Sequence, residues 1–333
     1  MAHTKTADTL KGRQAKEVEA PSRRRPGPWR RWWERPDLMP YLLVAPAIFC
    51  ELLVHFIPMV AGVVMSFFQL TLFTLHHWSS APFGGLSNFR VAVDVNGPIG
   101  SALLRSFEIT VPYTILVVAI SWVIGMVGAV GLNAEFRGRS WLRSALLIPY
   151  ALPVYVGIIV WSFMLQRTTG VINTVLVRDL HALHNPPFWL LGTDAFWSMV
   201  AAAVWRWFPF AFLILLASLQ NIPSELYEAA AVDGAGAWRQ FRKITLPSLR
   251  SANLVLVLVL FLWNFNDFNT PYVMFGSSPP STADLISLHI YTVSFESWNV
   301  GLGSAMSVLL MIFLLVVSMI YLRALRRGGE FNV

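Results

Sequence analysis

The stretch LRSFEITVPYTILVVAISWVIGMVGAVGLN, residues 104–133, decides the fold class of this chain. Its two charged residues, Arg105 and Glu108, lie near its start, and the remainder is apolar or small. A bilayer core about 30 Å thick is crossed by roughly 20 apolar residues in a helix. A backbone in lipid must also satisfy its own hydrogen bonds, which a helix does. The stretch is therefore predicted to be a membrane-spanning helix.

Five further stretches have the same character: 41–71, 141–165, 195–219, 253–275 and 301–325. The composition agrees, because 56% of the residues are hydrophobic and only 13% are charged, whereas soluble domains carry roughly 25% charged residues. A mean hydropathy of +0.57 excludes a disordered chain and most soluble enzymes. The single cysteine, Cys50, excludes a disulfide framework. We predict an all-α membrane protein with six transmembrane helices.

The positions of the basic residues predict how the chain is oriented in the membrane. Lys and Arg number 25 against 18 Asp and Glu, for a formal net charge of +7. Twenty of the 25 fall on one side of the predicted membrane, in residues 1–35, in the loops near 137–143 and 239–250, and at 323–327. Basic residues concentrate in cytoplasmic segments, so both termini are predicted to be cytoplasmic. The charge excess is then a topology signal, and we expect no nucleic-acid partner.

The chain divides by composition into three parts. Residues 1–40 are basic and contain Pro21, Pro26 and Pro28, so we expect a disordered cytoplasmic tail. Residues 41–325 hold all six predicted spans, and residues 326–333 form a short cytoplasmic C-terminal tail.

The loop after the fourth predicted span reads NIPSELYEAAAVDGAGAWRQFRKITLP, residues 221–247. Pro223 suits the start of a helix, and Glu225 and Glu228 suit the positive end of its dipole. Gly234 and Gly236 are expected to break that helix, because glycine permits a backbone reversal. The result is a helix–bend–helix knob that favours docking of a partner. An ordinary interfacial helix with a basic, tryptophan-bearing face is the alternative.

The same loop carries a resemblance to a known family. Glu228-Ala229-Ala230, then Gly234, then Ile244-x-Leu246-Pro247 resembles the EAA loop of the permease subunits of binding-protein-dependent ABC sugar importers, of the maltose/glycerol-phosphate type. The likeness covers about residues 41–325 and includes GLSNF at 85–89. In that family the loop fits a groove on the ATP-binding subunit. The resemblance implies that the coupling loop is 221–250 and that its contact residues are Glu228, Ala229, Ala230, Asp233, Gly234, Ile244, Leu246 and Pro247.

The resemblance also implies the fold, the location and the partners. The fold would be that of a type I ABC importer permease, with 41–325 as the permease domain, in the bacterial cytoplasmic membrane. The partners would be a second, homologous permease subunit forming a heterodimer, two ATP-binding subunits, an extracytoplasmic solute-binding protein and a sugar, expected to be a neutral mono- or oligosaccharide. Lipid surrounds the chain.

We expect no enzyme activity in this chain. None of its four lysines follows a glycine, so it has no phosphate-binding loop. It is expected to bind no cofactor, because ATP and Mg are used by the partner ATPase. An ATP-independent secondary transporter or channel is the alternative, although the internal symmetry of such folds is not visible.

Polar and aromatic residues inside the fourth and fifth spans are candidates for the substrate pathway. Asn264 and Asp267 share one face of a continuous helix, Asn266 and Asn269 share the neighbouring face, and Pro271 is expected to leave the Asp267 carbonyl unpaired. Amides and carboxylates bind hydroxyl groups, and aromatic rings stack on sugars. The predicted pathway residues are Trp205, Arg206, Trp263, Asn264, Asn266, Asp267, Asn269 and Tyr272. A polar lock between permease subunits is the alternative.

Three smaller features remain open. Arg206 either lines the same cavity or pairs with Asp267 or Glu51 as a structural lock. Glu51 and His55, four residues apart on the first span, could form a pair on one face, and the favoured interpretation is a packing pair near the protein interior. The remaining histidines on the outer side lack a cluster of carboxylate or cysteine ligands, so no metal site is predicted.

Overall fold

A computed structural model describes residues 39–327 of the chain. The predicted disordered tail therefore lies almost entirely outside the described residues, as does most of the C-terminal tail. Within residues 39–327 all regular elements are helices or helical turns, and the only β pairing is one isolated antiparallel bridge, Phe68–Phe83. The chain forms two compact units, Met1–Met59 and Val60–Val333, which are described separately.

In the first unit a helix of the predicted first span is present. Helix α2 (Met39–Glu51) passes through a π-helical turn (Leu52–Phe56) into α3 (Ile57–Met65), which continues into the second unit. Together they are long and apolar enough to cross a membrane. His55 Nδ1 lies 3.2 Å from Glu51 Oε2, so the predicted pair is confirmed.

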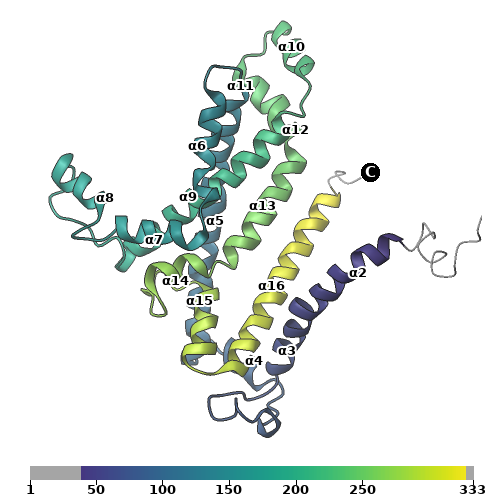
Figure 1. Cartoon of the computed structure of the whole chain (residues 1–333), viewed down its shortest axis with the longest axis vertical. Helices are drawn as coiled ribbons and strands as arrows, with labels where there is room; N and C mark the ends of the chain where they lie inside the picture. The colour runs from purple at the N-terminus through teal and green to yellow at the C-terminus, as the bar shows by residue number, and fades with distance from the viewer. Residues whose placement is uncertain (1–38, 328–333) are drawn as a thin grey trace, which may run out of the picture. The chain divides into compact units, whose positions relative to one another are not determined.

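The core of the second unit is a long helix pair, α5 (Pro98–Asn133) and α9 (Gly192–Leu219), with α13 (Arg250–Phe265) and α16 (Val300–Arg327) beside it (Figure 1). Small residues allow α5 and α9 to approach closely. A Cβ on Gly125 would lie 2.7 Å from the Phe212 backbone nitrogen, so only glycine fits there. Close backbone approach through small residues is the usual way helices pack in membranes.

The third predicted span is present but bent, which the sequence did not indicate. Helix α6 (Arg139–Ala151) and helix α7 (Val154–Met164) meet at 92°. Leu152 has an extended ψ of 144° because it precedes Pro153, and a residue before proline is disfavoured in helical conformation. The described residues thus hold five candidate spans, or six if the bent pair is counted as one.

The fifth predicted span is also interrupted. Helix α13 ends at Phe265, and α14 (Asn269–Phe275) begins after a three-residue break. The continuous faces predicted for Asn264 with Asp267, and for Asn266 with Asn269, are therefore wrong. Pro271 lies in the first turn of α14, where its missing N–H removes no helix hydrogen bond. Helix α14 packs against α7, so the two short helices that follow the breaks meet.

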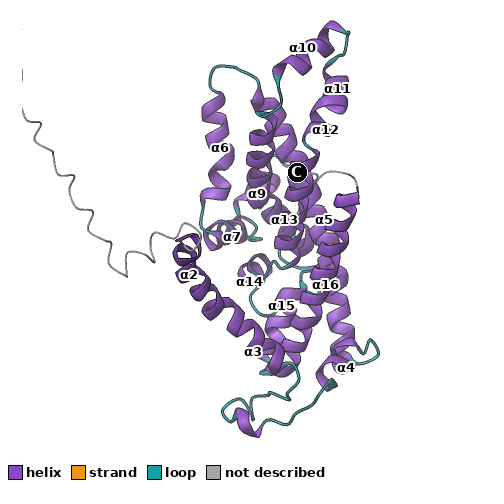
Figure 2. Ribbon diagram, turned by 90° about the vertical axis from the view of Figure 1, so that its right-hand side faces the viewer, coloured by secondary structure: helices purple, strands orange, loops and turns teal. Residues whose placement is uncertain are grey.

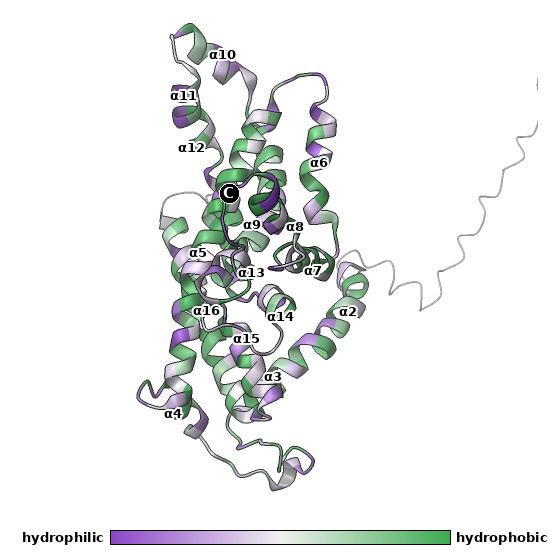
Figure 3. Cartoon of the chain, turned by 90° about the vertical axis from the view of Figure 1, so that its left-hand side faces the viewer, coloured by the Kyte–Doolittle hydropathy of each residue, from purple (hydrophilic) through white to green (hydrophobic). Residues whose placement is uncertain are grey.

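The shorter elements gather at the two ends of the long helices. At one end lie α10 (Ser224–Val232), α11 (Ala237–Gln240), a π-helical turn (Phe241–Thr245) and α12 (Leu246–Ser248) (Figure 2). Toward the other end lie α4 (Ser87–Val93), α15 (Ile286–Tyr291) and the π-helical turn Thr292–Glu296. The remaining short elements are the 3₁₀ turn Trp78–Ser80, α8 (Val171–Asn173) and the π-helical turn Thr174–Asp179. Hydrophobic residues dominate the long helices, and hydrophilic ones gather at α10 and α11 (Figure 3).

Candidate functional site

The bend after α10 is fixed by backbone hydrogen bonds that require glycine. The Ala235 N–H donates to the Ala230 carbonyl at 2.8 Å, and the Gly234 N–H donates to the Ala231 carbonyl at 3.0 Å. This is the Schellman pattern, which places its turning residue in the left-handed region. Gly234 has φ +74°, which other residues adopt only with strain. The predicted break at Gly234 is therefore confirmed.

Two side-chain contacts hold the second half of the loop against the first. Gln240 Nε2 donates to the Ala235 carbonyl at 2.9 Å, and the hydroxyls of Tyr227 and Thr245 lie 2.9 Å apart. Thr245 is buried, and Ile244 and Leu246 beside it are half-buried. Sequence reasoning missed Tyr227 and Thr245, because a pair 18 residues apart has no local signal. These contacts hold the knob, residues 221–247, in one shape.

The outer surface of the knob is open. Glu228, Ala229, Asp233, Gly234 and Pro247 are exposed, and Ala230 is half-buried. Beside them Val232 is 89% and Trp238 is 73% exposed, the latter stacked on Phe241 with ring centroids 5.6 Å apart. Exposed apolar side chains rimmed by charge mark a surface suited to a protein partner.

Inside the long helices, Asp267 is buried and already bonded within the chain. Its carboxylate accepts the Tyr113 hydroxyl at 2.7 Å, the Thr270 hydroxyl at 2.5 Å and the Thr270 N–H at 3.1 Å. The carboxylate therefore caps the start of α14 and ties it to α5. Sequence reasoning missed Tyr113, which lies 154 positions away in sequence.

The three asparagines predicted for the pathway are separated. Asn264 is fully buried; its Nδ2 donates to the Leu260 carbonyl at 2.8 Å, while its Oδ1 has no partner among the described residues. Asn266 is exposed, and its Nδ2 donates to the Leu262 carbonyl at 3.0 Å. Asn269 is half-buried at the start of α14. A buried acceptor without a donor is a place where a substrate hydroxyl or a water can bind.

The predicted aromatic residues fall into separate groups. Trp263 lies over Trp207 at 5.0 Å and against Phe210 at 5.1 Å between ring centroids. Trp205 instead contacts Trp161 at 6.2 Å. The fourth-span tryptophans therefore face different neighbours.

Arg206 lies over the Trp207 ring, with Cζ 4.6 Å from the centroid. Within residues 39–327 no ion pair joins Arg206 to Asp267, so the lock predicted between these two is not formed. Glu51, the other predicted partner, belongs to the first unit.

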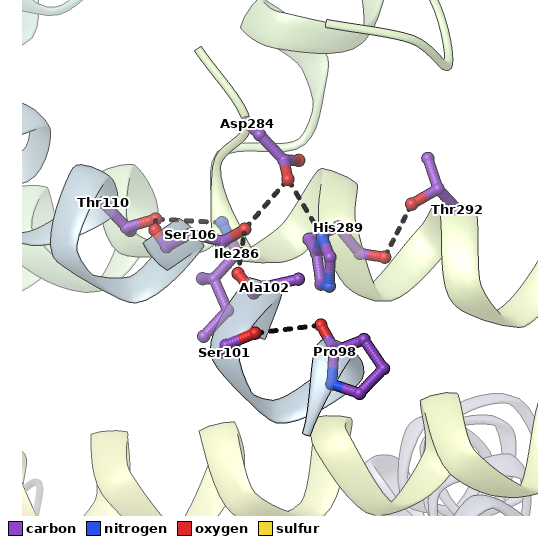
Figure 4. Close-up of polar contacts among 9 residues, drawn as sticks. All are labelled: Pro98, Ser101, Ala102, Ser106, Thr110, Asp284, Ile286, His289 and Thr292. Carbon is purple, nitrogen blue, oxygen red and sulfur yellow. Dashed lines mark hydrogen bonds and ion pairs between the residues drawn. The ribbon is translucent and has the colours of Figure 1, made fainter. Parts of the chain in front are cut away.

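Near the end opposite the knob, a polar cluster joins α5 to α15 (Figure 4). Asp284 Oδ2 accepts the Ser106 hydroxyl at 2.9 Å and lies 2.9 Å from His289 Nδ1. Thr110 Oγ1 accepts the Ile286 N–H at 2.9 Å. His289 Nε2 is buried without a partner among the described residues. Sequence reasoning missed this cluster because Asp284 and His289 belong to no motif.

The long apolar helices, with an exposed knob at one end, are those of a multi-pass membrane protein. Residues 107–328 match the family "Binding-protein-dependent transport system inner membrane component", and the chain belongs to this family. It is a multi-pass inner-membrane protein, as the sequence predicted.

Relatives match over most of the chain. YcjO, an inner membrane ABC transporter permease protein of Escherichia coli K12, is 32% identical over 296 residues, covering 88% of this chain and 96% of YcjO. MalF, a trehalose/maltose transport system permease protein of Thermococcus litoralis, is 31% identical over 288 residues, covering 85% of this chain and 92% of MalF. The family resemblance predicted from the EAA-type loop is confirmed.

A solved structure shares the fold. A chain of a bacterial alginate ABC transporter, in complex with an alginate pentasaccharide-bound periplasmic protein, superposes with a TM-score of 0.72 at 19% identity, covering 91% of this chain and all of that one. The predicted ABC permease fold is confirmed.

Proposed function

We propose that this chain is the permease subunit of an ATP-driven importer that carries a neutral mono- or oligosaccharide across the cytoplasmic membrane. The observation that carries the proposal is the knob, residues 221–247, which is held in one shape by contacts within the chain and is open on its outer surface. Relatives support a sugar, because MalF of Thermococcus litoralis is a trehalose/maltose and SugA of Mycobacterium tuberculosis a trehalose transport system permease protein. The ATP-independent transporter or channel is the alternative that the test below addresses.

The knob would convert ATP-driven motion into helix motion. ATP and Mg would be held by two partner ATPases, whose closure would push on α10. Because Gly234 and the Tyr227–Thr245 contact leave the knob rigid, the push would pass through α12 into α13. A second permease subunit, homologous to this one, would supply the other wall of the pathway.

The pathway would begin at an extracytoplasmic binding protein and pass the buried polar groups. Asn264 Oδ1 is free to accept a sugar hydroxyl, and Trp263 is 44% exposed beside it. Asn266, Asn269, Tyr272, Trp205 and Arg206 would line other parts of the route. Asp267 would not contact the sugar and would instead hold the start of α14 in position. A lone arginine among these groups suits a neutral solute better than a phosphorylated one.

The test is a bulky residue at Gly234, with a matched control at Gly138. A Cβ at either position would meet nothing within 4 Å, and both glycines have positive φ, +74° and +92°. Gly234→Leu and Gly138→Leu therefore impose similar strain without a clash inside this chain. We expect Gly234→Leu to abolish uptake and substrate-stimulated ATP hydrolysis in the assembled transporter.

Gly138→Leu is expected to retain most of both activities. Gly234→Asn, which tolerates the left-handed conformation, is expected to be intermediate. Intact uptake and ATPase coupling in Gly234→Leu would overturn the assignment of the knob. Uptake that persists without any ATPase would favour the alternative.

A further inference from the structure

Four aromatic rings lie in continuous contact toward the end of the long helices that is opposite the knob. They are Phe268 and Tyr272 of the α14 region and Tyr291 and Phe295 of α15 and the turn after it; together they are called the aromatic ladder. Ring centroids lie 4.8 Å apart for Phe268–Tyr272, 4.9 Å for Phe268–Tyr291, 5.4 Å for Tyr272–Tyr291 and 5.2 Å for Tyr291–Phe295.

The ladder is built by two helical pairs that interleave. Phe268 with Tyr272, and Tyr291 with Phe295, are each four residues apart, so each pair shares a helix face. Phe268 follows Asp267, whose bonds to Tyr113 and Thr270 hold its backbone in place. Phe295 lies in the π-helical turn Thr292–Glu296, a type of segment frequent at functional sites. The rings are therefore positioned by a rigid scaffold.

The ladder is accessible and has a polar edge. Phe295 is 58% exposed, and the other three rings are half-buried. A hydrogen bond with Tyr272 raises the pKa of Tyr291 above its ordinary value, and the Glu296 carboxylate nearby adds to the shift. A tyrosine hydroxyl is protonated at neutral pH in any case, so Tyr291 can donate a hydrogen bond, and the nearby Glu296 carboxylate offers acceptors.

We propose that the aromatic ladder is a binding platform for neutral pyranose sugars on the route into the substrate pathway. The flat apolar faces of pyranose rings match aromatic faces, while tyrosine hydroxyls and a carboxylate bind sugar hydroxyls. The Glu296 charge disfavours anionic sugars at this edge. Tyr272 joins the ladder to the pathway predicted from the sequence. The inference rests on the proposed function, and it adds Phe268, Tyr291, Phe295 and Glu296 to the residues that meet substrate.

The first experiment measures access and sugar protection at Phe295. Cys50 is the only cysteine, so Phe295→Cys in a Cys50→Ser background gives a single thiol. The complete transporter, with its permease partner, ATPases and binding protein, is placed in nanodiscs and treated with a charged methanethiosulfonate. We expect labelling to slow severalfold when the binding protein is loaded with the transported sugar, relative to sugar-free binding protein; the sugar is chosen from a panel of neutral mono- and oligosaccharides that includes trehalose and maltose.

Phe73→Cys is the matched control, since Phe73 is 90% exposed and lies outside the ladder. Its labelling is expected to be the same with loaded and sugar-free binding protein. Absence of labelling at Phe295→Cys would mean that lipid or the partner permease covers the ladder, and would overturn the proposal. The proposal would also be overturned if sugar-free binding protein slowed the labelling as much as loaded binding protein does.

The second experiment separates ring chemistry from packing. We expect Phe295→Leu to lower the uptake rate of a neutral sugar about threefold to tenfold, the size of one lost aromatic contact, and Phe295→Tyr to restore it. Phe73→Leu should retain wild-type uptake. Equal uptake by Phe295→Leu and wild type would overturn the platform alone. If the wild-type transporter imports none of the panel, the proposed function itself fails and the platform with it.

Discussion

At the residue scale, Asp267 shows how a group predicted to meet substrate can be engaged by the protein itself. It is 6% exposed and receives three hydrogen bonds from Tyr113 and Thr270. Such saturation leaves little capacity for a ligand. Asn264 is the opposite case, because it is fully buried and its side-chain carbonyl oxygen has no donor among the described residues. Among the predicted pathway residues, we therefore expect the Asn264 amide rather than the Asp267 carboxylate to accept a substrate hydroxyl.

Removal of the Tyr113 hydroxyl tests this assignment. Tyr113→Phe deletes one donor to a buried carboxylate, and leaving a buried polar group short of a partner costs about 1–3 kcal/mol. We expect a lower midpoint of thermal unfolding for the purified transporter. Tyr155→Phe, at a 53% exposed position, is the control and should not change the midpoint. An unchanged midpoint in Tyr113→Phe would contradict the role given to Asp267.

At the element scale, the closeness of α5 and α9 depends on residues without bulk. A Cβ at Gly125 would lie 2.7 Å from the Phe212 nitrogen and 2.8 Å from the Ala211 Cβ. Neither the backbone of α9 nor its alanine can move aside without moving the whole helix. Gly131, six residues further along α5, meets nothing within 4 Å. The two glycines therefore separate packing from helix propensity.

Valine at these two positions is expected to have very different effects. Gly125→Val should separate α5 from α9 and reduce the yield of folded transporter severalfold, because overpacking a tight contact costs about 1–3 kcal/mol. Gly131→Val adds the same side chain to the same helix without a clash. Size-exclusion yield and thermal unfolding of both variants measure the difference. Equal yields would show that the helices can readjust.

Prolines show why the elements were only partly predictable. Pro112 and Pro209 lie inside continuous helices α5 and α9, whereas Pro153 lies at a 92° bend. Hydropathy detects length and polarity, so it found the long helices. Whether a proline breaks a helix depends on neighbours that satisfy the freed carbonyl, and these come from distant sequence. Likewise, Tyr113 and Asp267 are 154 positions apart in the sequence, so their contact could not be predicted. The bend at Gly234 depends only on neighbouring residues and was predictable.

At the scale of the whole molecule, the basic loops lie at one end of the helices. Arg139 begins α6, and Arg239, Arg242 and Lys243 belong to the knob, in the same region of Figure 2. Arg90 and Arg167 lie in segments that the sequence predicts to be outside. From the positive-inside rule we therefore predict that the knob faces the cytoplasm.

This orientation can be measured with single thiols in intact spheroplasts. In a Cys50→Ser background, Ser80→Cys should react with a membrane-impermeant maleimide added outside, because Ser80 lies in a loop predicted to be external. Arg137→Cys should react only after the membrane is permeabilised. The reverse pattern would place the knob outside, and an ATPase could not reach it.

The packing of α7 on α14 has a consequence for how the chain is made. These helices have 11 and 7 residues, and at 1.5 Å per residue each is far shorter than a bilayer core of about 30 Å. Helix α14 continues the candidate span Arg250–Phe275, whereas α7 follows the 92° bend and cannot cross the membrane by itself. Helix α7 leaves the ribosome about a hundred residues before its partner α14, so its final position must wait for the fifth span. We therefore expect a folding step after insertion, in which α7 docks on α14.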